Sequence, residues 1–158
     1  MIDSWLDSCC RRVLGRAPSL RRPQVWLGPT HGLRRAHARP PAPSAARARR
    51  LEHLAAYVLE LALPEYAALQ WLPSQLAAGA VALARGWLGA PAWSPTLAHY
   101  ARYEAAELRP VAAALHALAQ RAACRATYQL PAVREKYAAP ARLCVSSLAP
   151  PAAPPALG

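Results

Sequence analysis

The side chains that could do chemistry gather most closely in the stretch WSPTLAHYARYEAAELRPV, residues 93–111. It contains Trp93, His99, Tyr100 and Tyr103, so an imidazole lies among aromatic rings with polar edges. Such a group could bind a ligand, but the same rings can also fill the corner between a short helix and a long one. We interpret the cluster as a packing joint, with a ligand site as the alternative.

No second motif supports catalysis or metal binding. His99 and His116 have no third ligand at zinc-like spacing, and the adjacent Cys9 and Cys10 do not form a CxxC motif. The serines show no GxSxG elbow, the glutamates no paired-carboxylate pattern, and the glycines no phosphate-binding loop. The sequence therefore predicts a protein that is not an enzyme and uses no cofactor and no metal.

For the other polar side chains we expect ordinary surroundings. Cys124 and Cys144 should be buried or half-buried thiols, and reduced thiols are typical of an intracellular protein. His53 should face solvent, and so should the helix-face charges Glu52, Glu60 and Glu65. We find no signal peptide and no apolar run of membrane-spanning length, so no membrane partner is expected.

The positive charge is concentrated near the N-terminus. Of a net charge of +11, residues 1–50 contribute +9, from 11 Arg against Asp3 and Asp7. Residues 51–158 are nearly balanced. A basic block can attract nucleic acid through its phosphates, but a solvated arm is the reading we favour. Residues 1–50 are thus expected to be a mostly irregular or disordered arm, and nucleic acid is not the expected partner.

Hydrophobic periodicity between the arm and the C-terminus predicts helices only. Leu51, Leu54, Val58 and Leu61 form a core-facing stripe that Pro64 ends. Ser94 and Pro95 are typical of a helix start, as N-cap and first helical residue. The five expected helices cover residues 51–62, 73–89, 94–101, 104–123 and 131–137. We therefore expect an all-α fold for residues 51–148, followed by a disordered Pro-rich tail, residues 149–158.

Three of these stretches resemble the C-terminal cyclin box of mitotic cyclins, and the B-type most: LPSQLAAGAVALA, WSPTLAHYARYEAAELRPV and VREKYAAPARLCVSSL. The resemblance implies a compact five-helix domain around a central helix of small residues. It covers about residues 51–148, with weaker similarity from residue 29. One departure is Glu104, where the family usually has a Thr that caps the long helix. The positions that match the family's motifs are Pro73, Ser74, Gln75, Ala77, Ala78, Gly79, Ala80, Trp93, Pro95, Thr96, Leu97, His99, Tyr100, Tyr103, Leu108, Pro110, Lys136 and Tyr137.

The resemblance also implies a role and a partner. It suggests a regulatory protein that binds a cyclin-dependent serine/threonine kinase in the mitotic cell cycle, in the nucleus and cytoplasm. We find no segment that would supply the first cyclin box, which carries the main kinase-facing surface in the family, so kinase binding should be weakened. Two alternatives remain open: an Arg-rich nucleic-acid-binding helical protein, and a cyclin fragment without function of its own.

Overall fold

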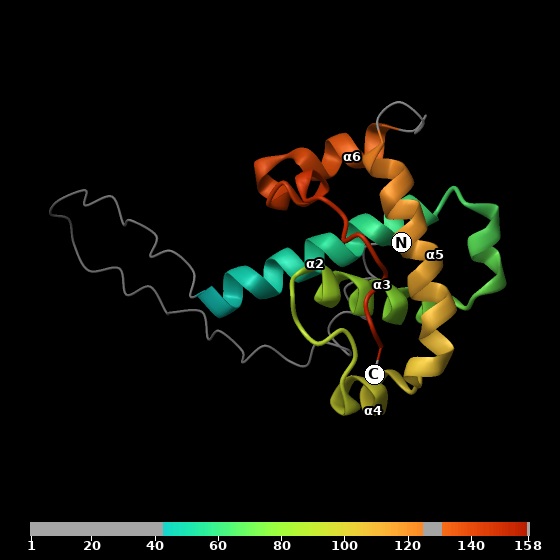
Figure 1. Ribbon diagram of the computed structural model, residues 1–158. Coiled ribbons are helices and arrows are strands. Elements are labelled where there is room, and N and C mark those ends of the chain that lie inside the picture. The colour runs from blue at the N-terminus through green and yellow to red at the C-terminus, as the bar shows by residue number, and fades with distance from the viewer. Residues whose placement is uncertain (1–42, 125–130, 158) are drawn as a thin grey trace, which may run out of the picture.

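The computed structural model describes residues 43–124 and 131–157. Within these ranges the fold is all-α, as expected, and contains no strand. Figure 1 shows α6 and α4 at opposite ends of the domain, with α2 and α3 between them and α5 running alongside. The helices are α2 (Pro43–Ala62), α3 (Pro73–Trp87), α4 (Pro95–Ala101), α5 (Ala105–Ala123) and α6 (Pro131–Ala138), with 3₁₀ turns η1 (Tyr66–Gln70), η2 (Pro140–Arg142) and η3 (Val145–Ser147).

Helix α2 begins at Pro43, eight residues before the start that the apolar stripe predicted. Residues 45–50, rich in Ala and Arg, are exposed, so no burial pattern marks them as helical. Ala and Arg are nonetheless strong helix formers, and they extend a helix that the core has already nucleated. The expected irregular arm therefore ends in helix, and its residues 1–42 lie outside the described part of the chain.

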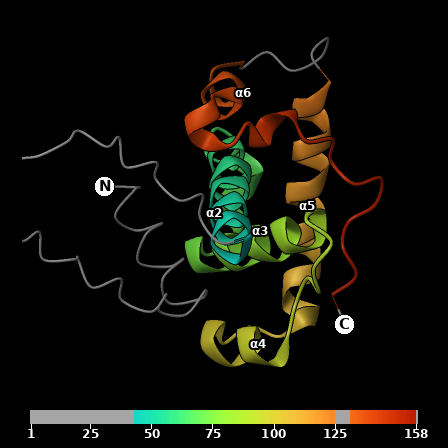
Figure 2. The same ribbon diagram turned by 90° about the vertical axis from the view of Figure 1, so that its left-hand side faces the viewer.

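Helix α3 is the central helix. All eight residues from Ala77 to Ala84 are buried, and α3 packs against both α2 and α5. A Cβ added at Gly79 would lie 2.7 Å from a methyl carbon of Val111 on α5. The two helices therefore cross too closely at this point for any residue larger than glycine to fit without a shift. Figure 2 shows α3 lying between α2 and α5. Small residues make this close crossing possible.

The main core forms where α2, α3 and α5 meet. Its α2 side is the predicted stripe of Leu54, Val58 and Leu61, each fully buried. Leu115 and Leu118 of α5 close the cluster from the other side. Burying each of these side chains contributes about 1.5–3 kcal/mol, which makes this cluster the main source of stability.

The Pro-rich C-terminal tail, which was expected to be disordered, is packed against the domain over residues 149–157. Residues 149–157 form neither helix nor strand, yet they lie along the outside of α3 and α5 (Figure 1, red). Leu157 is buried in a second apolar cluster beside Leu108 and Ala112. The tail packs because helices built from small residues leave room at their surface for Pro and Leu side chains.

Candidate interaction surface

The aromatic cluster is a packing joint in part. Trp93 donates its indole N–H to the carbonyl of Tyr103 at 3.2 Å, and the Tyr103 hydroxyl lies 2.7 Å from the Ser74 hydroxyl on α3. Both rings pack against the second apolar cluster. These contacts fix the turn between α4 and α5 against the start of α3. For Trp93 and Tyr103 the packing interpretation is confirmed.

The other two members of that cluster point elsewhere. His99 and Tyr100 are both exposed and contact each other edge to face, with 5.3 Å between ring centroids. They sit on the last turns of α4, whose buried residue is Leu97. Because α4 is only seven residues long, it has one inward face, and His99 and Tyr100 are not on it. The four aromatic side chains therefore do not form one site.

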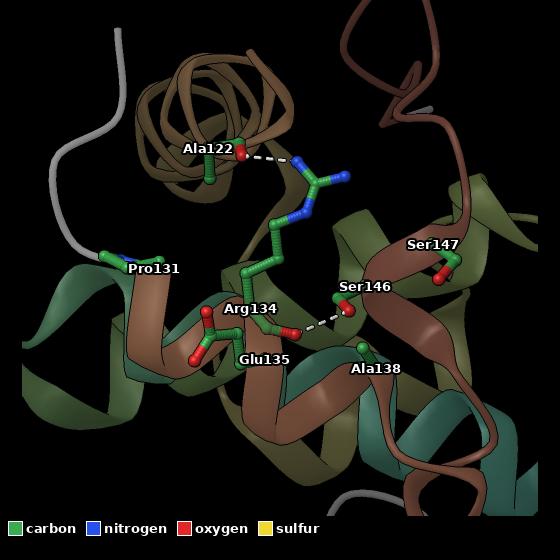
Figure 3. Close-up of a pocket in the computed structure, with 7 residues that line it drawn as sticks. All are labelled: Ala122, Pro131, Arg134, Glu135, Ala138, Ser146 and Ser147. Atoms are coloured by element: carbon green, nitrogen blue, oxygen red, sulfur yellow. Dashed lines mark hydrogen bonds between the residues drawn. The ribbon is translucent and has the colours of Figure 1, made fainter. Parts of the chain in front are cut away.

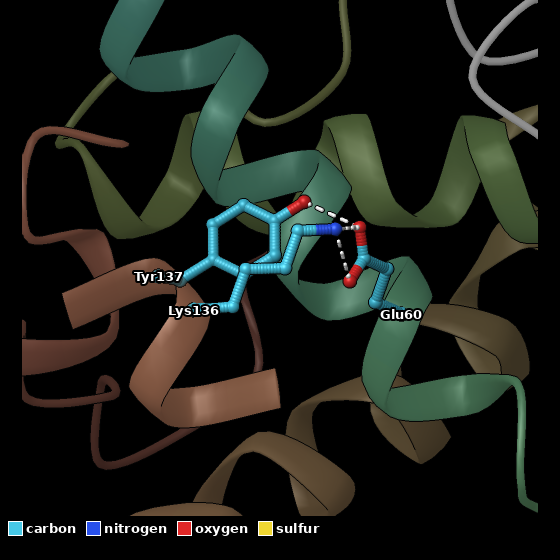
Figure 4. A network of polar contacts seen from close by, with 3 residues as sticks. All are labelled: Glu60, Lys136 and Tyr137. Atoms are coloured by element: carbon cyan, nitrogen blue, oxygen red, sulfur yellow. Dashed lines mark hydrogen bonds and ion pairs between the residues drawn. The ribbon is translucent and has the colours of Figure 1, made fainter. Parts of the chain in front are cut away.

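A polar network joins α6 to α2 (Figure 4). The Lys136 ammonium donates to both Glu60 carboxylate oxygens at 2.7 and 2.9 Å, and the Tyr137 hydroxyl donates to one of them at 2.8 Å. The Glu60 side chain is only 15% exposed. The expectation that Glu60 is a solvated charge is therefore wrong. Its carboxylate is held by two donors from another helix, which is how a buried charge is normally satisfied.

A pocket lies between α6, η3 and the end of α5 (Figure 3). Arg134 crosses it and donates to the carbonyls of Ala122 and Ala123 at 2.9 Å, so the guanidinium caps the C-terminus of α5. Ser146 donates its hydroxyl to the Arg134 carbonyl at 2.8 Å. The polar groups of the pocket hold helix ends together, and none of these contacts pairs a nucleophile with a base.

The remaining site expectations concern the thiols, a metal and a membrane. Cys124 and Cys144 are exposed, so the expectation of buried or half-buried thiols is wrong. Over residues 43–124 and 131–157, no three His, Cys, Asp or Glu side chains gather where they could hold a metal ion. In the same ranges, no helix combines the length and apolarity that crossing a bilayer requires. Cys9 and Cys10 lie outside the described residues.

Apolar side chains are exposed along the connection between α2 and α3. Leu63, Tyr66, Leu69 and Leu72 are 61–87% exposed and recur at every third residue. A 3₁₀ helix has three residues per turn, so Tyr66 and Leu69 of η1 project from the same side. This segment, drawn green at the right of Figure 1, loops away from the other helices. We call these four residues the apolar row. This row was not predicted from the sequence, although its spacing of three residues is visible there.

Most family-matching positions lie at helix starts or in packed faces, whereas His99, Tyr100 and Pro110 are exposed. Pro73 begins α3, and Gln75 accepts the backbone N–H of Leu72 at 3.1 Å. At α5 the Glu107 carboxylate likewise accepts the N–H of Glu104 at 2.8 Å. Glu107 therefore supplies a bond at this helix start, where the family's Thr is replaced. Pro95 begins α4, Leu108 is buried, and Thr96 and Pro110 are exposed. The matching positions do not converge on one pocket.

The described fold is thus an all-helical domain built around a central helix of small residues. Residues 29–151 match the model of the cyclin C-terminal domain, and the chain belongs to the cyclin family. It is 45% identical to Cyclin-A2-2 of Arabidopsis thaliana over 104 residues, which are 64% of the chain and 23% of the relative. It is 39% identical to human Cyclin-A1 over 109 residues, which are 65% of the chain and 22% of that protein.

A B-type cyclin is also among the relatives. The chain is 38% identical to the G2/mitotic-specific cyclin-B of Patella vulgata over 95 residues, 60% of the chain and 22% of the relative. Because A-type relatives match at higher identity, the narrower expectation of a B-type protein is not confirmed. The chain spans about a fifth of the length of the curated relatives it matches.

Proposed function

We propose that the chain is a regulatory subunit that controls a cyclin-dependent serine/threonine kinase during the mitotic cell cycle, in the nucleus and cytoplasm. It acts by protein–protein binding, and the kinase supplies all the chemistry. Membership of the cyclin family supports this role. The name of one relative, G2/mitotic-specific cyclin-B, supports the stage of the cycle.

The observation that carries the proposal is the apolar row. Exposed leucines scattered singly are normal on a protein surface, but a contiguous apolar patch is typical of an interaction site. The row contains large side chains that a partner can bury, and Tyr is enriched in the centres of interfaces. The charge within this segment is Glu65, which pairs with Arg121 at 3.1 Å. The row is therefore a nearly neutral surface on a basic protein.

The test is binding of the purified chain to a purified cyclin-dependent kinase, followed by biolayer interferometry. We expect saturable binding that weakens at least tenfold when Tyr66 and Leu69 are both changed to Asp. Ala67→Asp combined with Gln70→Asp is the matched control, because it adds two charges in the same exposed turn without removing a member of the row. Absence of binding would overturn the proposal, and equal binding by all variants would show that the row is not the contact surface.

We expect no stimulation of histone phosphorylation by this chain in the same assay. It spans only about a fifth of its relatives, and the kinase-activating surface of the family is implied to lie in another box. Robust stimulation by the purified chain would contradict this expectation.

Nucleic-acid binding is the alternative function. It is favoured by Arg47, Arg49 and Arg50, which are exposed on the first turns of α2. Binding through phosphates weakens steeply as salt rises, whereas burial of the apolar row should depend little on salt. A steep fall in affinity for duplex DNA or RNA between 50 and 200 mM salt, roughly 10³-fold or more, would favour this alternative.

A further inference from the structure

The tail is held by side chains that recognise its backbone. Trp87 of α3 donates its indole N–H to the carbonyl of Ala149 at 2.7 Å. His116 of α5 lies 2.7 Å from the carbonyl of Pro151 through Nε2, and because a carbonyl can only accept, Nε2 carries the proton. Gln120 donates to the carbonyls of Pro151 and Ala152 at 3.4 and 3.3 Å. Three side chains thus bond the backbone carbonyls of Ala149, Pro151 and Ala152.

Two apolar contacts anchor the far end of the same segment. The Cβ position of Gly86 lies 2.5 Å from Cβ of Pro155, so the proline sits directly on the bare backbone of α3. Leu157 is 4% exposed and enters the cluster that contains Ala82 and Leu108. The domain therefore contacts the tail from the carbonyl of Ala149 to the side chain of Leu157.

This pattern of contacts suits a proline-rich ligand in particular. Residues 149–157, APPAAPPAL, contain four prolines, which have no N–H and leave their carbonyls without partners inside the segment. A surface that binds such a segment must supply donors, and here Trp87, His116 and Gln120 supply them. His116 is itself only 4% exposed with the tail in place, so its imidazole is shielded from water where it meets the Pro151 carbonyl. Proline-rich segments also lose little conformational entropy on binding, since their free form is already extended.

We propose that the face of α3 and α5 formed by Gly86, Trp87, His116 and Gln120 is a binding site for proline-rich segments. The chain's own tail fills it in cis, and a proline-rich segment of another protein binds there when the tail is displaced. This site is separate from the apolar row and does not depend on the proposed kinase function. It gives the domain a second surface whose access is controlled by its own C-terminus.

The experiment uses a fluorescent peptide of residues 148–158 and the full chain carrying Leu157→Asp. The charged Asp cannot enter the apolar cluster, so the tail should leave the site while the site itself is unchanged. Fluorescence anisotropy should show saturable binding to this variant. The wild-type chain should bind at least tenfold more weakly, because its own tethered tail competes at an effective concentration on the order of millimolar. No binding by the folded variant, or equal binding by both chains, would overturn the proposal.

Two further variants, each combined with Leu157→Asp, place the peptide on this face. Gly86→Ala adds a methyl where Pro155 must lie and improves helix propensity, so the fold should be kept while peptide affinity falls at least tenfold. His116→Phe replaces the imidazole with another aromatic ring that has no N–H donor, and should weaken binding about fivefold to tenfold. Peptide affinity unchanged by both variants would contradict the assignment.

A measurement on the wild-type chain covers the case in which Leu157→Asp does not fold. Millimolar peptide should displace the tail and speed hydrogen exchange at the amide of the buried Leu157, while a peptide carrying Leu157→Asp should not. No change in exchange at saturating peptide would overturn the proposal.

Discussion

Glu60 and Lys136 lie 76 positions apart in the chain and form a two-oxygen ion pair at 2.7 and 2.9 Å. The carboxylate belongs to α2 and the ammonium to α6, so this contact holds the last helix of the domain against the first described one. Tyr137 reinforces the contact with its hydroxyl, and its ring packs at a tilt against Tyr57 of α2, with ring centroids 5.5 Å apart. These contacts attach α6 to α2, while Arg134 of the same helix attaches it to the end of α5.

Replacing Glu60 should cost more than replacing Lys136. Glu60→Ala removes the acceptor of both donors, and we expect the free energy of unfolding to fall by about 1.5–3 kcal/mol. Lys136→Met leaves Tyr137 bonded to Glu60, and the lysine side chain is 44% exposed, so the loss should be about 1 kcal/mol or less. Urea denaturation followed by circular dichroism measures both. Equal losses would show that the ammonium carries the contact.

Gly79→Ala should strain the crossing of α3 and α5. The added Cβ would lie 2.7 Å from a Val111 methyl carbon, and overpacking of this kind costs about 1–3 kcal/mol. Val111→Ala removes that methyl, so the double variant should be more stable than the two single losses predict. Thermal denaturation of the four proteins gives the coupling energy. Strictly additive losses would contradict the close contact.

Ser94→Ala should destabilise the start of α4. The Ser94 hydroxyl accepts the backbone N–H of Leu97 at 3.3 Å, and loss of an N-cap of this kind costs about 1 kcal/mol. Ser94→Asp is the control, because a carboxylate can accept the same bond and favours the positive end of the helix dipole. The free energy of unfolding in urea separates the two. An aspartate variant as unstable as the alanine variant would refute the capping role.

His53 should make the domain less stable in acid. Burial lowers its pKa, Arg142 and Arg49 lower it further, and Glu52 opposes them. The folded state thus binds the proton less well than the unfolded chain. His53 therefore leaves the free energy of unfolding unchanged well above pH 6.5, and lowers it increasingly as pH falls through the folded-state pKa. His53 is only partly exposed, so the expectation that it faces solvent is wrong.

The measurement compares wild type with His53→Gln. Unfolding free energies at pH 7.5 and 5.0 should fall less for the variant than for the wild-type chain, since both share every other titrating group. A steeper fall for the variant would show that folding does not lower the pKa of His53.

The local sequence was sufficient to predict the helices that form the core. The stripe of Leu54, Val58 and Leu61 and the Ser94–Pro95 start both appear in the structure where the pattern placed them. Helix α3 ends at Trp87, two residues before the predicted end, and Gly89 just beyond it has the left-handed backbone (φ +68) that favours glycine. These signals work because helix periodicity and capping depend on residues three or four positions apart.

Contacts between distant residues could not be predicted in this way. Nothing near Glu60 distinguishes it from a solvated charge, since its partners come from a helix more than seventy positions later. The tail looked structureless because its carbonyl partners, Trp87 and His116, belong to α3 and α5. Periodicity and capping fixed which segments are helical. Folding alone decided which surfaces are covered and which, such as the apolar row, remain exposed, because burial depends on how helices far apart in the chain meet.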